Sequence, residues 1–116
     1  EIGGHLVSGH IHCTARLLER KATENNLSLH LGLAHKWLDY VLYKGFICVD
    51  GASLTVGEKT DQGFWLHLIP ETLRVTTLGE KALGELFNIE IDSTTQTTID
   101  TIKGLAASGE LKRWLS

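Results

Sequence analysis

The chain has 116 residues, enough for one domain with a single hydrophobic core, and its apolar (42%) and charged (22%) fractions are those of a globular protein. The formal charge of −3 argues against a nucleic-acid partner, because phosphate backbones are bound through clustered Lys and Arg. No window reaches the roughly 20 apolar residues of a membrane span and no signal-peptide pattern occurs, so we expect a cytoplasmic protein without a membrane partner.

Short apolar runs predict β-strands along most of the chain. The clearest lies at 27–33, where leucines alternate with Ser28, His30 and Gly32, the period of two of a strand with one buried face. Similar runs, many of them separated by Gly, Asp or Asn, lie at 11–17, 46–50, 53–57, 64–69 and 86–91. About six short strands predict an all-β domain that closes into a barrel.

Helical spacing occurs between the second and third of these segments. Trp37, Leu38, Val41 and Leu42 fall on one face, and Gly45 follows as a stop. We therefore expect a short helix that plugs one end of the barrel.

The last part of the chain also has a helical pattern. After Asp92, apolar residues recur every three or four positions behind a Ser/Thr-rich start that supplies an N-cap. Gly104 and Gly109 each weaken this helix by roughly 1 kcal/mol relative to Ala, so its apolar stripe is expected to need a partner surface.

The histidines and cysteines do not form a convincing metal or redox motif. Cys13 and Cys48 lie far apart and are expected to be free thiols. His10 and His12 share one strand face, but no third ligand is evident, so we expect no metal and place His12 on the surface.

The segment 50–56 places two hydroxyls, Ser53 and Thr55, on one strand face and Leu54 on the other. A solvated polar face explains this alternation at least as well as a ligand site does. The spacing alone leaves both interpretations open.

Three charged or rigid residues mark the ends of elements. Pro70 is the only proline, and it can begin a helical turn where a strand ends, which frees backbone amides. Lys44 precedes Gly45, and Asp92 ends the last strand. Lone charges at such positions are usually solvated caps, so neither stands out as functional.

Five motifs in this order and spacing resemble the C-terminal barrel of riboflavin synthases. They are Gly3-Gly4-His5-Leu6-Val7-Ser8-Gly9-His10, Tyr43-Lys44-Gly45-Phe46, Asp50-Gly51-Ala52-Ser53-Leu54-Thr55-Val56, His67-Leu68-Ile69-Pro70-Glu71-Thr72-Leu73 and Asn88-Ile89-Glu90-Ile91-Asp92. The likeness covers nearly the whole chain.

The resemblance implies a six-stranded antiparallel Greek-key barrel at 1–93, with a short plug helix, and a C-terminal helix at 94–116 that contacts other subunits of a homotrimer. It also implies an enzyme without metal or added cofactor. Two molecules of 6,7-dimethyl-8-ribityllumazine would react to give riboflavin and a pyrimidinedione. This barrel would bind one of them, and the N-terminal barrel of another subunit would complete the site.

Carried over by position, the resemblance also implies the substrate-binding residues. Leu54 and Ile69 would flank the ring, Thr55 and Thr72 would hydrogen-bond to its edge, and Lys44 would offer charge to an oxygen. The whole set is Gly9, His10, Ile11, Lys44, Ser53, Leu54, Thr55, Ile69, Pro70, Glu71, Thr72, Leu73 and Arg74.

Catalysis would require removal of a methyl proton and addition of a nucleophile to a ring carbon. His10 and Ser53 are the candidates, since histidine exchanges protons near neutral pH and a serine can add to the ring or orient water, with Asp92 polarising one of them. The family's N-terminal barrel has Cys where Ser53 stands, so which barrel is the stronger catalytic side stays open.

Two other hypotheses compete with a half-enzyme. The fold also serves lumazine or flavin carriers without activity, although the polar set Ser53, Thr55, His10 and Lys44 favours an enzyme. The barrel could instead pair with itself through its tail stripe and pocket rim. The absence of any methionine suggests a domain excised from a longer protein.

Overall fold

The computed structural model describes residues 11–109. Every segment with a strand pattern overlaps an observed strand, which confirms the all-β prediction, and α2 begins at Pro70 as expected. The elements are, in order, β1 (Cys13–Ala22), β2 (Leu27–Gly32), α1 (His35–Leu38), β3 (Phe46–Val49), β4 (Ala52–Thr55), β5 (Gly63–Leu68), α2 (Pro70–Val75), the 3₁₀ turn η1 (Leu78–Glu80), β6 (Leu86–Glu90) and α3 (Ser93–Ser108).

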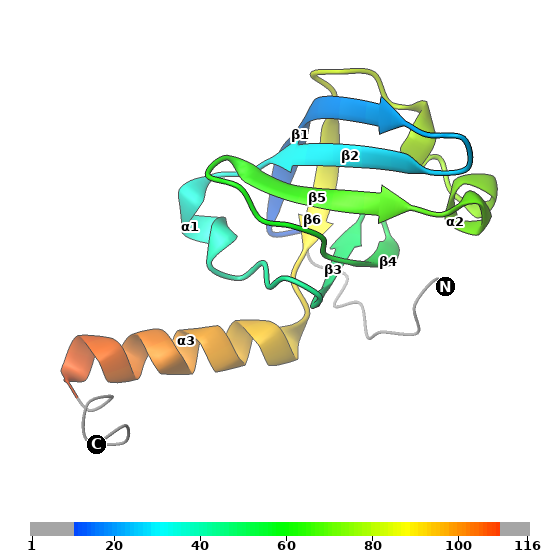
Figure 1. Ribbon diagram of the computed structural model, residues 1–116. Coiled ribbons are helices and arrows are strands. Elements are labelled where there is room, and N and C mark those ends of the chain that lie inside the picture. The colour runs from blue at the N-terminus through cyan, green and yellow to red at the C-terminus, as the bar shows by residue number, and fades with distance from the viewer. Residues whose placement is uncertain (1–10, 110–116) are drawn as a thin grey trace.

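The strands form one antiparallel sheet in the order β4-β3-β6-β1-β2-β5. This sheet curls into a nearly closed barrel, with β6 returning between β3 and β1 as in a Greek key (Figure 1). The predicted six-stranded barrel is therefore confirmed. Because β4 and β5 stand at the two ends of the order, the barrel has a seam between them.

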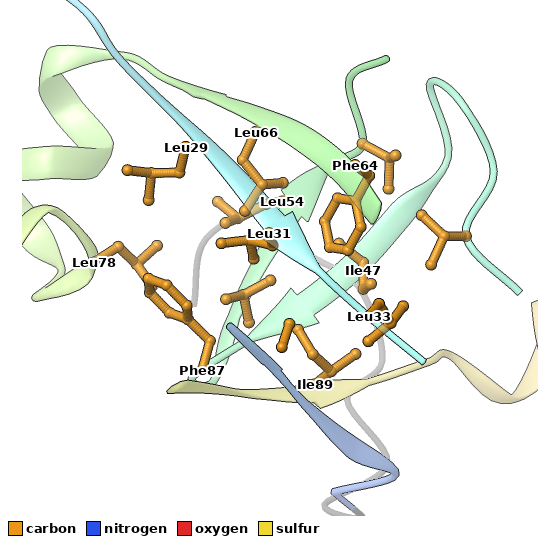
Figure 2. Close-up of a cluster of buried hydrophobic side chains, with 14 of the residues drawn as sticks. Leu29, Leu31, Leu33, Ile47, Leu54, Phe64, Leu66, Leu78, Phe87 and Ile89 are labelled. Atoms are coloured by element: carbon orange, nitrogen blue, oxygen red, sulfur yellow. The ribbon is translucent and has the colours of Figure 1, made fainter. Parts of the chain in front are cut away.

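The core fills the inside of this barrel. Leu27, Leu29 and Leu31 alternate inward along β2, and Phe64 and Leu66 of β5 meet them from the neighbouring strand. Figure 2 shows the labelled side chains of β2 and β5 converging with Ile47 of β3, Leu54 of β4 and Ile89 of β6 on one cluster. The residues between the leucines, Ser28 and His30, consequently lie on the outer face.

Helix α1 is shorter than the sequence pattern predicted. It ends at Leu38, and the following bonds from Tyr40 to Trp37 and from Val41 to Leu38 span only three residues, so the chain continues as tight turns. Leu38 and Val41 are still buried in the core, while Leu42 is 42% exposed. Figure 1 shows α1 and α2 at opposite ends of the barrel.

Helix α3 leaves the barrel after β6 and has no buried residue (Figure 1). Two contacts tie it to the turn after α1: the Tyr40 hydroxyl donates to Asp100, and Lys103 Nζ lies 3.0 Å from Asp39 Oδ2. The hydrogen bond and charge of Lys103 hold the pKa of Asp39 below its ordinary value. Among the described residues, no helix is long and apolar enough to cross a membrane.

The close approach of β2 and β5 generates a stability prediction. Gly63 pairs with Gly32, and a Cβ on Gly63 would lie 1.7 Å from the Leu31 carbonyl oxygen, whereas one on Gly104 in α3 would meet nothing within 4 Å. Gly63→Ala should lower the free energy of unfolding by about 3 kcal/mol or more, because the strands must separate. Gly104→Ala should raise α3 stability by up to about 1 kcal/mol.

Urea unfolding of the two variants beside the parent chain measures both effects. Equal stability of the parent and Gly63→Ala would contradict the close strand contact.

Candidate functional site

The seam between β4 and β5 organises the candidate site. Beyond β4 the chain crosses to β5 and pairs with its first residues: the Gly57 N–H donates to the Trp65 carbonyl, and the Trp65 N–H donates to the Glu58 carbonyl. Within the described residues, no strand pairs with the free edge of β4 itself. The seam is therefore held at one end by the segment after β4 and is open along β4.

Strand geometry determines which backbone groups face this open edge. Val56 uses its N–H and C=O on the β3 side, bonding to Gly45 and Lys44, while Gly57 donates in the opposite direction across the seam. Because successive residues of a strand direct their N–H and C=O groups to alternate edges, those of Ser53 and Thr55 face the seam like those of Gly57. A ligand at this edge would meet backbone donors and acceptors that no other strand within residues 11–109 engages.

The side chains of β4 alternate between the two faces of the strand as predicted, but their burial differs from the prediction. Leu54 points into the core and is only 7% exposed (Figure 2), so any contact it makes with a ligand on the outer face would run through its backbone. Ser53 lies on the other face and is 4% exposed, whereas Thr55 is exposed. The interpretation of this face as uniformly solvated is wrong, because Ser53 is covered.

Lys44 lies at the end of the β3–β4 hairpin farthest from the turn. The Lys44 N–H donates to the Val56 carbonyl at 2.9 Å, which places Lys44 just beyond the Phe46–Thr55 pair of this hairpin. Its backbone is left-handed, with φ 65°, and its ammonium lies 5.5 Å from the centre of the Tyr43 ring. The backbone of Lys44 therefore lies beside the exposed end of β4, and its side chain is exposed.

The end of β5 and the first turn of α2 form the opposite wall. Ile69 is the N-cap of α2 and is 56% exposed, and Pro70 begins the helix without needing an N–H. Thr72 is 7% exposed, and its carbonyl accepts from the N–H and hydroxyl of Thr76. Leu73 packs against the core. Of these four residues, Ile69 is the one that offers a large apolar surface outward.

A cavity of about 790 Å³ connects α2 with the turn between β3 and β4. Its wall includes Ala52, next to Ser53, and Arg74, whose guanidinium lies 2.7 Å from Glu71 Oε1. Thr76 and Thr77 also line it, although the sequence analysis did not select them. The sequence signal that could have identified these two threonines is their pair of adjacent hydroxyls just after the turn that begins at Pro70.

A smaller cavity of about 280 Å³ lies on the other side of the same turn. Ile11, which is 58% exposed, lines it together with Asp50 and Glu90. Asp50 has a left-handed backbone, accepts from the Asn88 N–H at 2.6 Å and pairs with Lys81 at 2.8 Å. Ile11 thus lies beside the hairpin that carries Ser53 and Thr55.

Three predicted residues remain, namely Gly9, His10 and Asp92. Gly9 and His10 lie outside the described residues. Asp92 is the N-cap of α3, where its carboxylate accepts from the N–H and hydroxyl of Thr95. His12 is only half exposed, contrary to expectation, and its Nδ1 accepts from the Ile91 N–H at 3.1 Å. Residues 11–109 contain no cluster of three or more His, Cys, Asp or Glu able to hold a metal.

Comparison with known proteins gives concordant matches. The family model described as "Lumazine binding domain" matches residues 8–92. The chain is 52% identical to the riboflavin synthase of Escherichia coli K12 over 111 residues, covering 95% of this chain and 52% of that protein. It is 45% identical to the riboflavin synthase of Chlamydia pneumoniae, covering 92% and 52%. The chain thus spans about half the length of the curated relatives it matches.

Solved structures show the same fold at lower identity. LumP in complex with 6,7-dimethyl-8-(1′-D-ribityl)lumazine superposes with a TM-score of 0.73 at 20% identity, covering 78% of this chain and 51% of that one. LumP in complex with riboflavin gives a TM-score of 0.69 at 20% identity, covering 74% and 47%.

The two bonds to Thr95 generate a prediction for Asp92. Asp92→Ala should weaken the start of α3 by about 1 kcal/mol, because it removes the acceptor for a free helix N–H. Asp92→Asn should preserve α3, since asparagine caps equally well. Hydrogen exchange at the α3 amides measures the change, and equal protection in the parent and Asp92→Ala would contradict the capping role.

Proposed function

Because the chain belongs to the lumazine binding domain family, we propose that its barrel is one half of a riboflavin synthase and binds one molecule of 6,7-dimethyl-8-ribityllumazine. The high identity to riboflavin synthases over 95% of the chain supports this assignment. The proposed reaction joins two such molecules: one transfers a four-carbon unit to the other, which gives riboflavin and a pyrimidinedione.

The open edge of β4 is the observation that carries the proposal. The pyrimidine side of a lumazine presents carbonyl and N–H groups along one edge, so it can pair with a strand edge as another strand would. The backbone groups of Ser53 and Thr55 face that edge, and the exposed side chain of Ile69 offers an apolar surface for the ring. Lys44 supplies positive charge near the exposed end of the same strand.

Ser53, His10 and Asp92 are the proposed catalytic groups of this half-site. Burial of Ser53 beside the seam supports a role in holding water or adding to the ring, since a covered hydroxyl is kept in one orientation. His10 would take the methyl proton. Asp92 would act only after its carboxylate leaves Thr95.

The other half of the site is proposed to come from the N-terminal barrel of another subunit in a trimer. The chain spans only about half of its relatives, and the transfer needs two lumazines face to face. Helix α3 supports an assembly role because its residues are all unburied and Ile102 is 45% exposed. We place this activity in the cytoplasm, where Cys13 and Cys48 stay reduced.

A ligand carrier without activity is the second candidate. The similar LumP structures hold a lumazine, riboflavin or flavin mononucleotide. Binding alone would need the strand edge but no buried hydroxyl, and Ser53 is present and covered. Single-turnover assays with both barrels present separate the two functions.

The strand-edge model makes a prediction about Thr55. Thr55→Pro removes an N–H that points away from β3, so it should spare the sheet and lower lumazine affinity roughly tenfold. Thr55→Val keeps that N–H and loses only the hydroxyl, and it should lower affinity by about threefold or less. Fluorescence titration of 6,7-dimethyl-8-ribityllumazine gives the dissociation constants. Equal affinity of all three proteins would refute pairing at this edge.

The proposed activity is tested by mixing. Alone, the chain should form almost no riboflavin. Addition of a separately produced N-terminal barrel of a riboflavin synthase should restore formation, and Ser53→Ala in this chain should then reduce the rate. Lumazine binding by the chain without riboflavin formation in any mixture would instead favour the carrier.

A further inference from the structure

Ser28, His67 and Glu58 form a continuous hydrogen-bonded chain on the outer face of the barrel. Ser28 Oγ lies 2.8 Å from His67 Nδ1, and His67 Nε2 lies 2.6 Å from Glu58 Oε1. A hydroxyl, an imidazole and a carboxylate in this order are the components of an activated serine nucleophile.

The sheet register creates this chain from residues far apart in sequence. Ser28 of β2 pairs directly with His67 of β5, so both side chains leave the same face. Gly57 leaves space for the imidazole, since a Cβ there would lie 3.0 Å from His67 Nε2. The Glu58 carbonyl accepts from the Trp65 N–H, which places Glu58 beside the ring.

The carboxylate selects the useful tautomer of His67. The hydrogen bond from His67 lowers the pKa of Glu58, so Glu58 is ionised at neutral pH and its oxygen accepts the Nε2–H. In neutral His67, Nδ1 is then unprotonated and can accept the hydroxyl proton of Ser28. His67 is thereby oriented as a general base for Ser28.

A cavity of about 290 Å³ gives access to this hydroxyl, and its wall consists of Lys21, Ser28, Glu58, Trp65 and His67. The Lys21 ammonium lies 4.9 Å from the Trp65 ring centre, and the Trp65 and His67 rings are parallel, 6.4 Å apart. The wall thus combines an aromatic face, a cation and a nucleophile. We propose that this cavity is a second site, separate from the strand-edge site, at which Ser28 accepts acyl groups from aryl esters.

The proposed step is an ordinary acyl transfer. Ser28 Oγ attacks the ester carbonyl and forms a carbon–oxygen bond while its proton passes to His67. The bond to the aryl oxygen then breaks, and the leaving aryloxide takes that proton. Water next adds to the acyl carbon while His67 takes one of its protons. The bond to Ser28 Oγ then breaks, that proton returns to Ser28 Oγ, and the carboxylic acid leaves.

The surroundings of Ser28 restrict the substrate. Strand β2 pairs with β1 on one side and β5 on the other, so its amides are engaged in the sheet and cannot bind the oxyanion. Lys21, paired directly with Ser28, is the nearby positive charge that can approach it. With one flexible cation in place of fixed donors, only esters with a good leaving group should react.

p-Nitrophenyl acetate is the probe. The full chain should release p-nitrophenol, read as p-nitrophenolate in neutral buffer. Quenching in acid before deacylation should trap one acetyl group, which peptide mass mapping should locate on Ser28. His67→Gln should slow acylation roughly 100-fold, the usual contribution of a general base, and Ser28→Ala should abolish the adduct.

Matched variants distinguish this site from ordinary surface chemistry. Ser108 is exposed in α3 and donates its hydroxyl to the Leu105 carbonyl, so Ser108→Ala should leave acylation unchanged. Glu58 acts as a positioning residue, so Glu58→Gln should slow the reaction and change its pH profile, with partial rescue in Glu58→Asp. An acetyl group on Lys21, equal labelling of Ser28 and Ser108, or an unchanged rate in His67→Gln would overturn the proposal. Peptide mass mapping of the parent chain identifies the acylated residue even if Ser28→Ala fails to fold.

Discussion

The unpaired edge of β4 is the constraint on which the proposed ligand site depends. A strand edge presents N–H and C=O groups that are costly to leave without a partner when they are covered. The chain closes part of its barrel with the segment after β4, which bonds to Trp65, while no other strand of the described residues pairs with the outer edge of Ser53 and Thr55. The β3–β4 hairpin, the seam and α2 together surround the proposed site, which a flat ligand with one polar edge would fill.

The fully paired part of the sheet around β2 explains how the proposed site keeps its shape. β2 is paired along both edges, and its leucines fill the core from the middle of the sheet. A shift of one residue would turn those leucines outward, so the register is strongly determined. The same register fixes every residue on the outer face, including Ser28 and His67. Core packing and the second proposed site therefore have one common origin.

Much of this architecture could be predicted from local patterns. The alternating leucines identified β2, and Pro70 identified the start of α2. Burial of Ser53 was not predictable from alternation, because alternation assigns a face and not what covers it. Helix α1 was overestimated because apolar spacing continues after the helical bonding stops at Leu38. The strand-edge residues themselves were found through resemblance, since Lys44 and Thr55 carry no distinctive local signal.

Lys44 illustrates the loss of stability that the proposed ligand site would bring with it. A left-handed backbone suits glycine, and any other residue there gives up about 1 kcal/mol. At position 44 the chain carries a long cationic side chain despite this unfavourable backbone conformation. A barrel selected for thermal stability alone would favour glycine at position 44. At this position, stability and the proposed ligand binding therefore favour different residues.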